Sequence, residues 1–153
     1  MLIVDDVMHT HVYKVKLGQT VSAVARTLIL HDVESALVFE GEELRGIITE
    51  RDLLRAVMPT GAELGEADSL RAFSDLVAVA RDHFAAPVES VMSAPVRTVE
   101  LGSSLIRALG TMLAGRIRRL PVVGPQGAVV GVVTQRDLLR AVFMEWQYEQ
   151  GIR

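Results

Sequence analysis

Hydrophobic positions along the chain form the same series of patterns in its two halves. Each half has a short extended run, then apolar residues at helical spacing, then two apolar runs separated by a turn, and then a second helical run. The elements expected in the first half are 12–15, 20–30, 36–39, 44–48 and 49–58. Those expected in the second half are 96–99, 103–115, 119–123, 128–133 and 135–148. The pattern predicts a β-α-β-β-α unit in each half, and therefore an α/β protein.

The strands of the second half, 119–123 and 128–133, alternate little between apolar and polar residues. Such runs are typical of strands that are buried on both faces. Between the halves, residues 59–67 contain Gly61 and Gly65 and are expected to form a loop. Residues 68–84 fit an amphipathic helix with one apolar stripe, which needs a repeat or a partner to cover it.

The chain also repeats itself in sequence. Residues 46–57 and 131–142 are two dodecapeptides with nine identical positions, and the other three are Ile/Val twice and Glu/Gln once. Upstream of each dodecapeptide lies a weaker repeat: seven residues between Val4 and Gly18 recur 84 positions later, between Val88 and Gly102. This is a tandem duplication. We expect repeat 1 at residues 1–58, a linker with the inserted helix at 59–87, and repeat 2 at 88–153.

Length and composition limit the class of protein. With 153 residues, two repeats of marginal size are expected to pack into one globule. A net charge of −3 without a broad basic face argues against nucleic acid. There are no cysteines, hence no disulfides. No apolar stretch is long and unbroken enough to be a signal peptide or a membrane span, so a cytoplasmic protein that does not contact membranes is expected.

Each dodecapeptide contains a Thr-x-x-Asp sequence, at Thr49 and Asp52 and at Thr134 and Asp137. Threonine at the N-cap with an acid three residues later is a helix-capping pattern. Capping does not explain the glycine three residues before each threonine, or the arginine before each aspartate. A strand glycine allows another group to approach the backbone closely.

These features resemble the CBS domain, the regulatory module named for cystathionine β-synthase, and specifically a tandem pair. The match rests on the two Gly-h-h-Thr-x-Arg-Asp segments, where h is Ile or Val, on the strand at 119–123 and on the Val-x-x-Val-Met sequences at 4–8 and 88–92. It implies two repeats packed by pseudo-twofold symmetry, with a cleft between them that binds an adenine nucleotide. The nucleotide is then a regulatory ligand and not a cofactor.

The resemblance also implies which residues bind the ligand. In each site the aspartate accepts hydrogen bonds from the ribose, while the threonine and the adjacent helix N-terminus meet a phosphate. One site combines His11, Val12, Thr49 and Asp52 with Arg118 and Arg119 from the other repeat. The second combines Pro95, Val96, Thr134 and Asp137 with Glu34 and Ser35. Arg51 and Arg136 are candidates for phosphate contact, and alternatively they are exposed helix residues.

The two implied sites differ in charge. Glu34 occupies the position that corresponds to Arg118, and a carboxylate repels a phosphate whereas arginine binds it. A phosphate is therefore expected to prefer the Asp52 site. No metal is expected: His9 and His11 fit an exposed pair, because no Cys or carboxylate cluster accompanies them.

The sequence thus predicts a regulatory, non-enzymatic nucleotide-binding module that acts through an unidentified protein or through its own assembly. A homodimer is expected through the helices at 50–58 and 135–148, whose apolar residues exceed the needs of one packing face. These residues are Leu53, Leu54, Val57, Leu138, Leu139, Val142 and Phe143. Two alternatives remain open: an interaction module without a ligand, and a site for another adenosyl compound such as S-adenosylmethionine.

Overall fold

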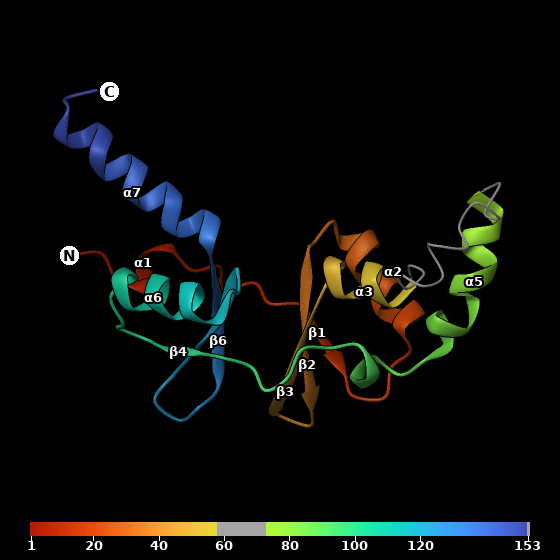
Figure 1. Cartoon of the computed structure of the whole chain (residues 1–153). Coiled ribbons are helices and arrows are strands. Elements are labelled where there is room, and N and C mark those ends of the chain that lie inside the picture. The colour runs from red at the N-terminus through yellow and green to blue at the C-terminus, as the bar shows by residue number, and fades with distance from the viewer. Residues whose placement is uncertain (58–72, 153) are drawn as a thin grey trace. The chain divides into compact units, whose positions relative to one another are not determined.

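A computed structural model describes residues 1–57 and 73–152 (Figure 1). The chain divides into two compact units. One comprises Tyr13–Pro95 and contains the first sheet; we call it the β1–β3 unit. The other joins Met1–Val12 to the part of the chain that begins at Val96 and contains the second sheet; we call it the β4–β6 unit.

The β1–β3 unit is built on a three-stranded sheet with the order β1-β2-β3. Strand β1 (Lys14–Lys16) runs parallel to β2 (Ser35–Glu40), which is antiparallel to β3 (Glu43–Thr49). Helix α2 (Val21–His31) connects β1 to β2, and α3 (Glu50–Val57) follows β3 directly. Helix α5 (Phe73–Ala85) and the short 3₁₀ helix η2 (Val88–Ser90) come next. Helix α5 contacts both α2 and α3, so this described part of the insert packs on the first repeat.

The β4–β6 unit has the same order of elements. Its sheet is β4-β5-β6, with β4 (Val99–Glu100) parallel to β5 (Arg119–Val123) and β5 antiparallel to β6 (Val129–Thr134). Helix α6 (Leu105–Gly115) connects β4 to β5, and α7 (Gln135–Glu149) follows β6. The short helix α1 (Val4–Val7) contacts α7. The predicted β-α-β-β-α order is confirmed in both repeats, with element ends displaced by a few residues.

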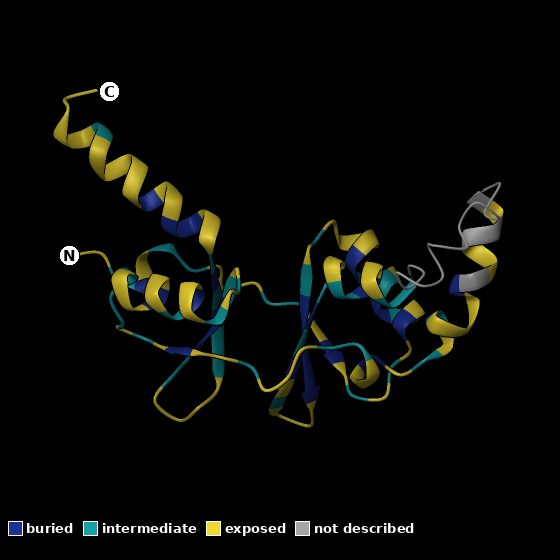
Figure 2. Ribbon diagram, viewed as in Figure 1, coloured by how far each residue is buried: buried dark blue, intermediate teal, exposed yellow. Residues whose placement is uncertain are grey.

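Burial follows the position of each strand in its sheet (Figure 2). In β2 the four residues from Ala36 to Phe39 are all buried, and in β5 Leu120 to Val122 are buried as well. These strands are central, as the unbroken apolar runs indicate. Strand β6 was expected to be buried on both faces, but only Gly131 and Val133 are buried in it. It is the outer strand of its three-stranded sheet, so only one of its faces contacts the core.

The segments that lead into the repeats are exchanged between the two units. Residues 1–12 begin repeat 1 but pack in the β4–β6 unit, where Val4 is fully buried in the core. Residues 86–95 join the end of the linker to the beginning of repeat 2 but pack in the β1–β3 unit, where Val88 is fully buried. We call these the lead-in segments. The sequence repeats therefore differ from the compact units, because each unit completes its core with the lead-in segment of the other repeat.

The two dodecapeptide glycines receive these lead-in segments. Gly46 and Gly131 lie inside β3 and β6. A Cβ atom on Gly131 would lie 2.8 Å from both the His9 carbonyl oxygen and the Met8 sulfur. A Cβ atom on Gly46 would collide with the Met92 side chain. The close approach that the glycines predict is therefore made by the repeated methionines of the chain itself.

Part of the inserted segment lies outside the described residues. The expected loop at 59–67 and the expected helix start at residue 68 both fall there. Of the predicted apolar stripe, Ala80 is buried and Phe84 packs against the core of the β1–β3 unit, whereas Val77 is exposed. The described helix thus buries part of its predicted stripe within the same chain.

Candidate functional site

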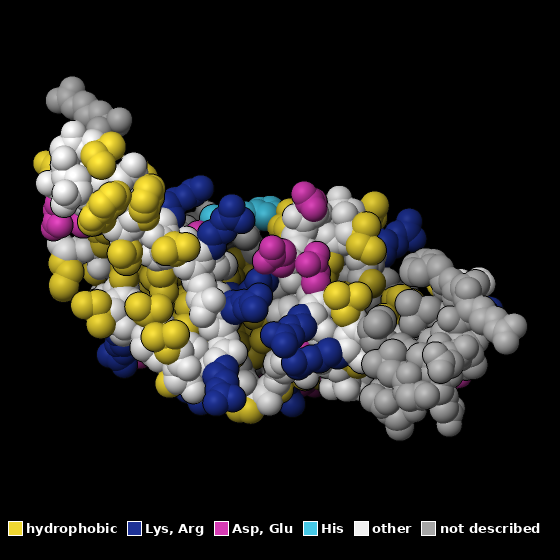
Figure 3. Space-filling view, turned by 45° about the horizontal axis from the view of Figure 1, so that its top comes forward, with side chains coloured by type: hydrophobic (Ala, Val, Ile, Leu, Met, Phe, Trp, Pro, Cys, Tyr) yellow, Lys and Arg dark blue, Asp and Glu magenta, His cyan; other side chains and the backbone are white. Residues whose placement is uncertain are grey.

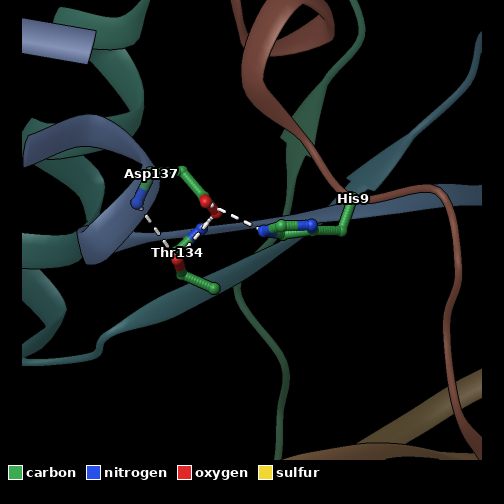
Figure 4. A network of polar contacts seen from close by, with 3 residues as sticks. All are labelled: His9, Thr134 and Asp137. Carbon is green, nitrogen blue, oxygen red and sulfur yellow. Dashed lines mark hydrogen bonds and ion pairs between the residues drawn. The ribbon is translucent and has the colours of Figure 1, made fainter. Parts of the chain in front are cut away.

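The Thr-x-x-Asp sequence at the start of α7 forms a capping box (Figure 4). Asp137 Oδ2 accepts hydrogen bonds from the Thr134 backbone N–H at 2.8 Å and from its hydroxyl at 2.7 Å. The Asp137 N–H donates in return to the Thr134 hydroxyl at 3.2 Å. The predicted capping role is therefore confirmed for this pair, and it uses only one of the two carboxylate oxygens.

The second oxygen of Asp137 is also occupied. His9 Nε2 lies 2.8 Å from Asp137 Oδ1, and Figure 4 shows the ring directed at the carboxylate. An ionised carboxylate can only accept, so Nε2 is the donor. Asp137 is 9% exposed, whereas the His9 side chain is 62% exposed. An exposed histidine thus contacts a carboxylate that is almost fully buried.

The same cap occurs at the start of α3. Asp52 Oδ2 accepts from the Thr49 N–H and from the Thr49 hydroxyl, both at 2.9 Å. The neighbour of Asp52 Oδ1 is the Ser93 hydroxyl, at 3.4 Å. That separation is longer than the roughly 2.5–3.0 Å of a good O–H···O bond. Asp52 is also less buried than Asp137. Its Oδ1 atom is therefore only weakly engaged.

His9 and Ser93 are equivalent residues, 84 positions apart, and the backbone holds them in the same way. His9 exchanges two backbone hydrogen bonds with Val132, both of 2.9 Å. Ser93 exchanges two with Ile47, of 2.9 and 3.0 Å. Each lead-in segment thus adds one antiparallel bridge to the outer strand of a sheet. The bridged strand residue, Val132 or Ile47, lies three residues before the helix that follows the strand. The two sites differ here in side chain and not in backbone.

Sheet register places a residue of the preceding strand opposite each threonine. Ser35 pairs with Thr49 across β2 and β3, and Arg119 pairs with Thr134 across β5 and β6. The Glu34 carbonyl accepts from the Glu50 N–H at 3.0 Å, just as the Arg118 carbonyl accepts from the Gln135 N–H at 2.8 Å. Each pair of strand-start residues is thus held against the helix that follows in its own repeat.

The structure distributes the predicted site residues over both compact units. It brings Arg118 and Arg119 together with the Asp137 cap, and Glu34 and Ser35 together with the Asp52 cap. The pairing across repeats that the resemblance implies stays a prediction. Arg51, Arg136 and Arg118 are exposed. The β4–β6 unit holds His11, Val12, Val96, Arg118, Arg119, Thr134, Arg136 and Asp137, and the β1–β3 unit holds Thr49, Arg51, Asp52, Pro95, Glu34 and Ser35.

The residue that distinguishes the two caps is His9, which was not predicted to contact Asp137. His9 was read only as one of an exposed histidine pair; it is exposed, but it also binds Asp137. A signal was available, since His9 and Ser93 both follow the repeated methionine. Among the described residues no group of three His, Cys, Asp or Glu side chains could hold a metal ion.

The Asp137–His9 pair lies in the wall of a groove of about 500 Å³ in the β4–β6 unit. The groove continues along one face of α7, past Arg140 and Met144 to Tyr148. The Asp137 carboxylate therefore adjoins space that a small molecule can enter, with His9 beside it.

Comparisons with known proteins agree with these observations. A family model described as the CBS domain matches twice, at residues 4–59 and 88–143. A 17.7 kDa protein of Acidianus ambivalens is 31% identical over 140 residues, which cover 91% of this chain and 72% of that protein. The Methanopyrus kandleri protein MK0525 is 33% identical over 123 residues, covering 80% of this chain. The matched region is 53% of MK0525, so the chain aligns with about half the length of that relative.

A solved structure shows the same fold. The CBS domain pair of protein MJ0100, crystallised in complex with 5′-methylthioadenosine and S-adenosyl-L-methionine, superposes with a TM-score of 0.71. The match covers 94% of this chain and 98% of that chain, at 21% sequence identity. In the part of the chain that the structure describes, every helix is too short or too polar to cross a membrane.

Proposed function

Since the chain belongs to the CBS domain family, we propose that it is a regulatory module that binds an adenosine-containing ligand through its Thr-x-x-Asp caps. The observation that carries this proposal is the geometry of the Asp52 cap. Its Oδ2 atom holds the start of α3, while Oδ1 has only a hydroxyl at 3.4 Å. A carboxylate oxygen held in place by its partner oxygen is well suited to accept from the hydroxyls of a ribose.

The adenosyl class of ligand is supported by the likeness to MJ0100, whose complex contains two adenosyl compounds. Within that class, AMP, ADP and ATP differ from S-adenosylmethionine in carrying phosphates. Arginine recognises phosphate through a bidentate contact, and the exposed Arg51 directly precedes Asp52. We propose an adenine nucleotide as the ligand, with its ribose on Asp52. We further propose that the chain acts by binding and not by catalysis.

Calorimetric titration of the full chain with AMP and with S-adenosylmethionine tests this function. We expect AMP to bind, and Asp52→Asn to weaken it about tenfold or more, the loss expected for a charged hydrogen bond. Asp137→Asn is the matched control, because it changes the equivalent residue, and it is expected to change AMP affinity less. Asparagine keeps one side-chain oxygen that can accept from the threonine in both variants. Absence of binding by either ligand contradicts the proposed function.

An apolar face on the β4–β6 unit supports the alternative of self-association, and the two functions are compatible. Figure 3 shows hydrophobic side chains gathered over α6 and α7. On α7, Leu139 and Val142 are 70% and 63% exposed, and Phe143 stacks with Trp146 at 5.8 Å between ring centroids. Leu53 and Leu138, which were expected to contribute, are buried in the two cores instead. We propose that the α7 face forms a homodimer, since monomers rarely expose a large apolar patch.

Sedimentation velocity tests the dimer at micromolar concentration. The chain is expected to sediment at twice its mass of 16.7 kDa, and Val142→Glu is expected to shift it to the monomer. Ile29→Glu provides the control, because Ile29 is an even more exposed apolar residue on α2 of the other unit. A monomeric wild-type chain contradicts the dimer and leaves ligand binding to be judged by calorimetry.

A further inference from the structure

The two caps differ at one equivalent residue, and we infer that this residue decides which cap accepts a ligand: His9 keeps the Asp137 carboxylate occupied. This inference rests on the proposed function, because it concerns the oxygen that we assign to the ribose. It adds a selectivity-determining residue that acts through its contact with the carboxylate. The equivalent Ser93 leaves the Asp52 carboxylate available.

Hydrogen-bond geometry supports this assignment. Asp137 Oδ2 already accepts two bonds from Thr134, so Oδ1 is the oxygen that remains for a ribose. His9 Nε2 lies 2.8 Å from that oxygen, within the range of a strong charge-assisted bond. A ribose hydroxyl must replace the imidazole or share the oxygen with it. At Asp52 the competing hydroxyl lies 3.4 Å away, so its displacement loses little.

Burial increases the difference between the two sites. With His9 in place Asp137 is 9% exposed, so a ligand can approach its carboxylate only from the groove that both residues line. The His9 ring, which is 62% exposed, lies against this carboxylate, with Nε2 2.8 Å from Oδ1. Displacing the ring without replacing its bond leaves a buried charge less well solvated, which is unfavourable. Asp137 is therefore a poorer acceptor for a ligand while His9 is present.

The remainder of the lead-in segment does not depend on the His9 side chain. The segment is held by two backbone hydrogen bonds between His9 and Val132 and by Val4 in the core. Ser93 makes the equivalent backbone bonds with Ile47. Exchanging the two side chains therefore changes the contact to each carboxylate while the backbone bridges stay in place. The two copies therefore allow a reciprocal test, in which each of these residues is replaced by the other.

The test uses His9→Ser and Ser93→His in the full chain, titrated by calorimetry with adenosine. Adenosine carries the ribose hydroxyls but no phosphate, so the charges of Glu34 and the arginines affect it less. We expect Ser93→His to weaken binding at Asp52 about threefold, which is about 0.6 kcal/mol. In the Asp52→Asn background, where binding is expected to be weak, we expect His9→Ser to restore it by about the same factor. Asp137→Asn is expected to remove the restored binding.

A second ligand identifies the contact. 2′,3′-Dideoxyadenosine lacks both hydroxyls, so neither exchange is expected to change its affinity. Equal responses by the two nucleosides overturn the inference, because the histidine then acts on something other than the ribose contact. Circular dichroism and thermal unfolding identify any variant that fails to fold; in that case His9→Asn and Ser93→Asn replace the exchanged pair.

The outcomes separate the inference from the proposed function. If the wild-type chain binds adenosine through Asp52 but neither exchange changes affinity, the inference is wrong and the proposed function stands. If the wild-type chain does not bind but His9→Ser creates binding that requires Asp137, the inference holds and the Asp52 assignment is wrong. If no variant binds adenosine or AMP, both are wrong.

Discussion

The starts of α3 and α7 carry the same four-residue cap in different surroundings. Both aspartates use Oδ2 to hold the preceding threonine, with bonds between 2.7 and 2.9 Å. They differ at Oδ1, where Asp137 has a histidine at 2.8 Å and Asp52 a serine at 3.4 Å. In both copies one carboxylate oxygen thus keeps the same structural role, while the residue that contacts the other oxygen differs between the copies.

The lead-in segments explain how this variation arises without loss of the fold. Each segment is fixed by a buried valine, by a methionine against a strand glycine and by two backbone bridges. These contacts are repeated in both copies. The next side chain, His9 or Ser93, faces the carboxylate and contributes little to the core. A residue in this place can change the site while the units stay intact.

The largest expected effect concerns the glycines beneath the lead-in segments. Gly131→Ala places a Cβ 2.8 Å from the His9 carbonyl oxygen, so the backbone has to move. We expect a loss of about 3 kcal/mol in the free energy of unfolding, the upper range for overpacking. Gly46→Ala meets only the Met92 side chain, which can rotate, and is expected to lose about 1 kcal/mol. Urea denaturation measures both losses.

Gly110→Ala is the control for this comparison. Gly110 lies within α6 with nothing within 4 Å of an added Cβ, so alanine is expected to stabilise the helix by up to about 1 kcal/mol. If Gly131→Ala is no more harmful than Gly46→Ala, the two lead-in segments are not packed as described.

Removal of each carboxylate is expected to have the next largest effect. Asp137→Ala removes a buried acceptor of three hydrogen bonds, and we expect a loss of about 2 kcal/mol, the upper end for a helix cap. Asp52→Ala removes a more exposed cap and is expected to lose about 1 kcal/mol. Thermal and urea unfolding compare the two. A larger loss for Asp52 contradicts the difference in burial and bonding.

The smallest expected effect belongs to the residues that distinguish the caps. His9→Ala removes a charge-assisted bond from a largely exposed ring, and we expect a loss of about 0.5 kcal/mol, because water replaces much of the bond. Ser93→Ala is expected to change stability by less than about 0.3 kcal/mol, since its bond is long. A loss above about 2 kcal/mol for His9→Ala indicates a structural role instead.

The sequence allowed the fold to be predicted more fully than the site. Periodicity and the repeat predicted the strands, the helices and the Thr134 cap, because these depend on local spacing. The exchange of the lead-in segments was not predicted, since no local pattern shows which core a buried valine such as Val4 or Val88 enters. Gly46 and Gly131 indicated a close approach but not the methionines that make it. His9 was missed because its partner lies 128 residues away.

A crystal structure of the full chain grown with AMP tests most directly the claim that the two caps differ as ligand sites. We expect the nucleotide beside Asp52, with its ribose hydroxyls within hydrogen-bond distance of Oδ1. At the same time His9 Nε2 is expected to stay on Asp137 Oδ1, at the 2.8 Å of the present structure. Nucleotide bound by Asp137 with Asp52 unoccupied contradicts the claim, and so does equal occupancy of both carboxylates with His9 in place.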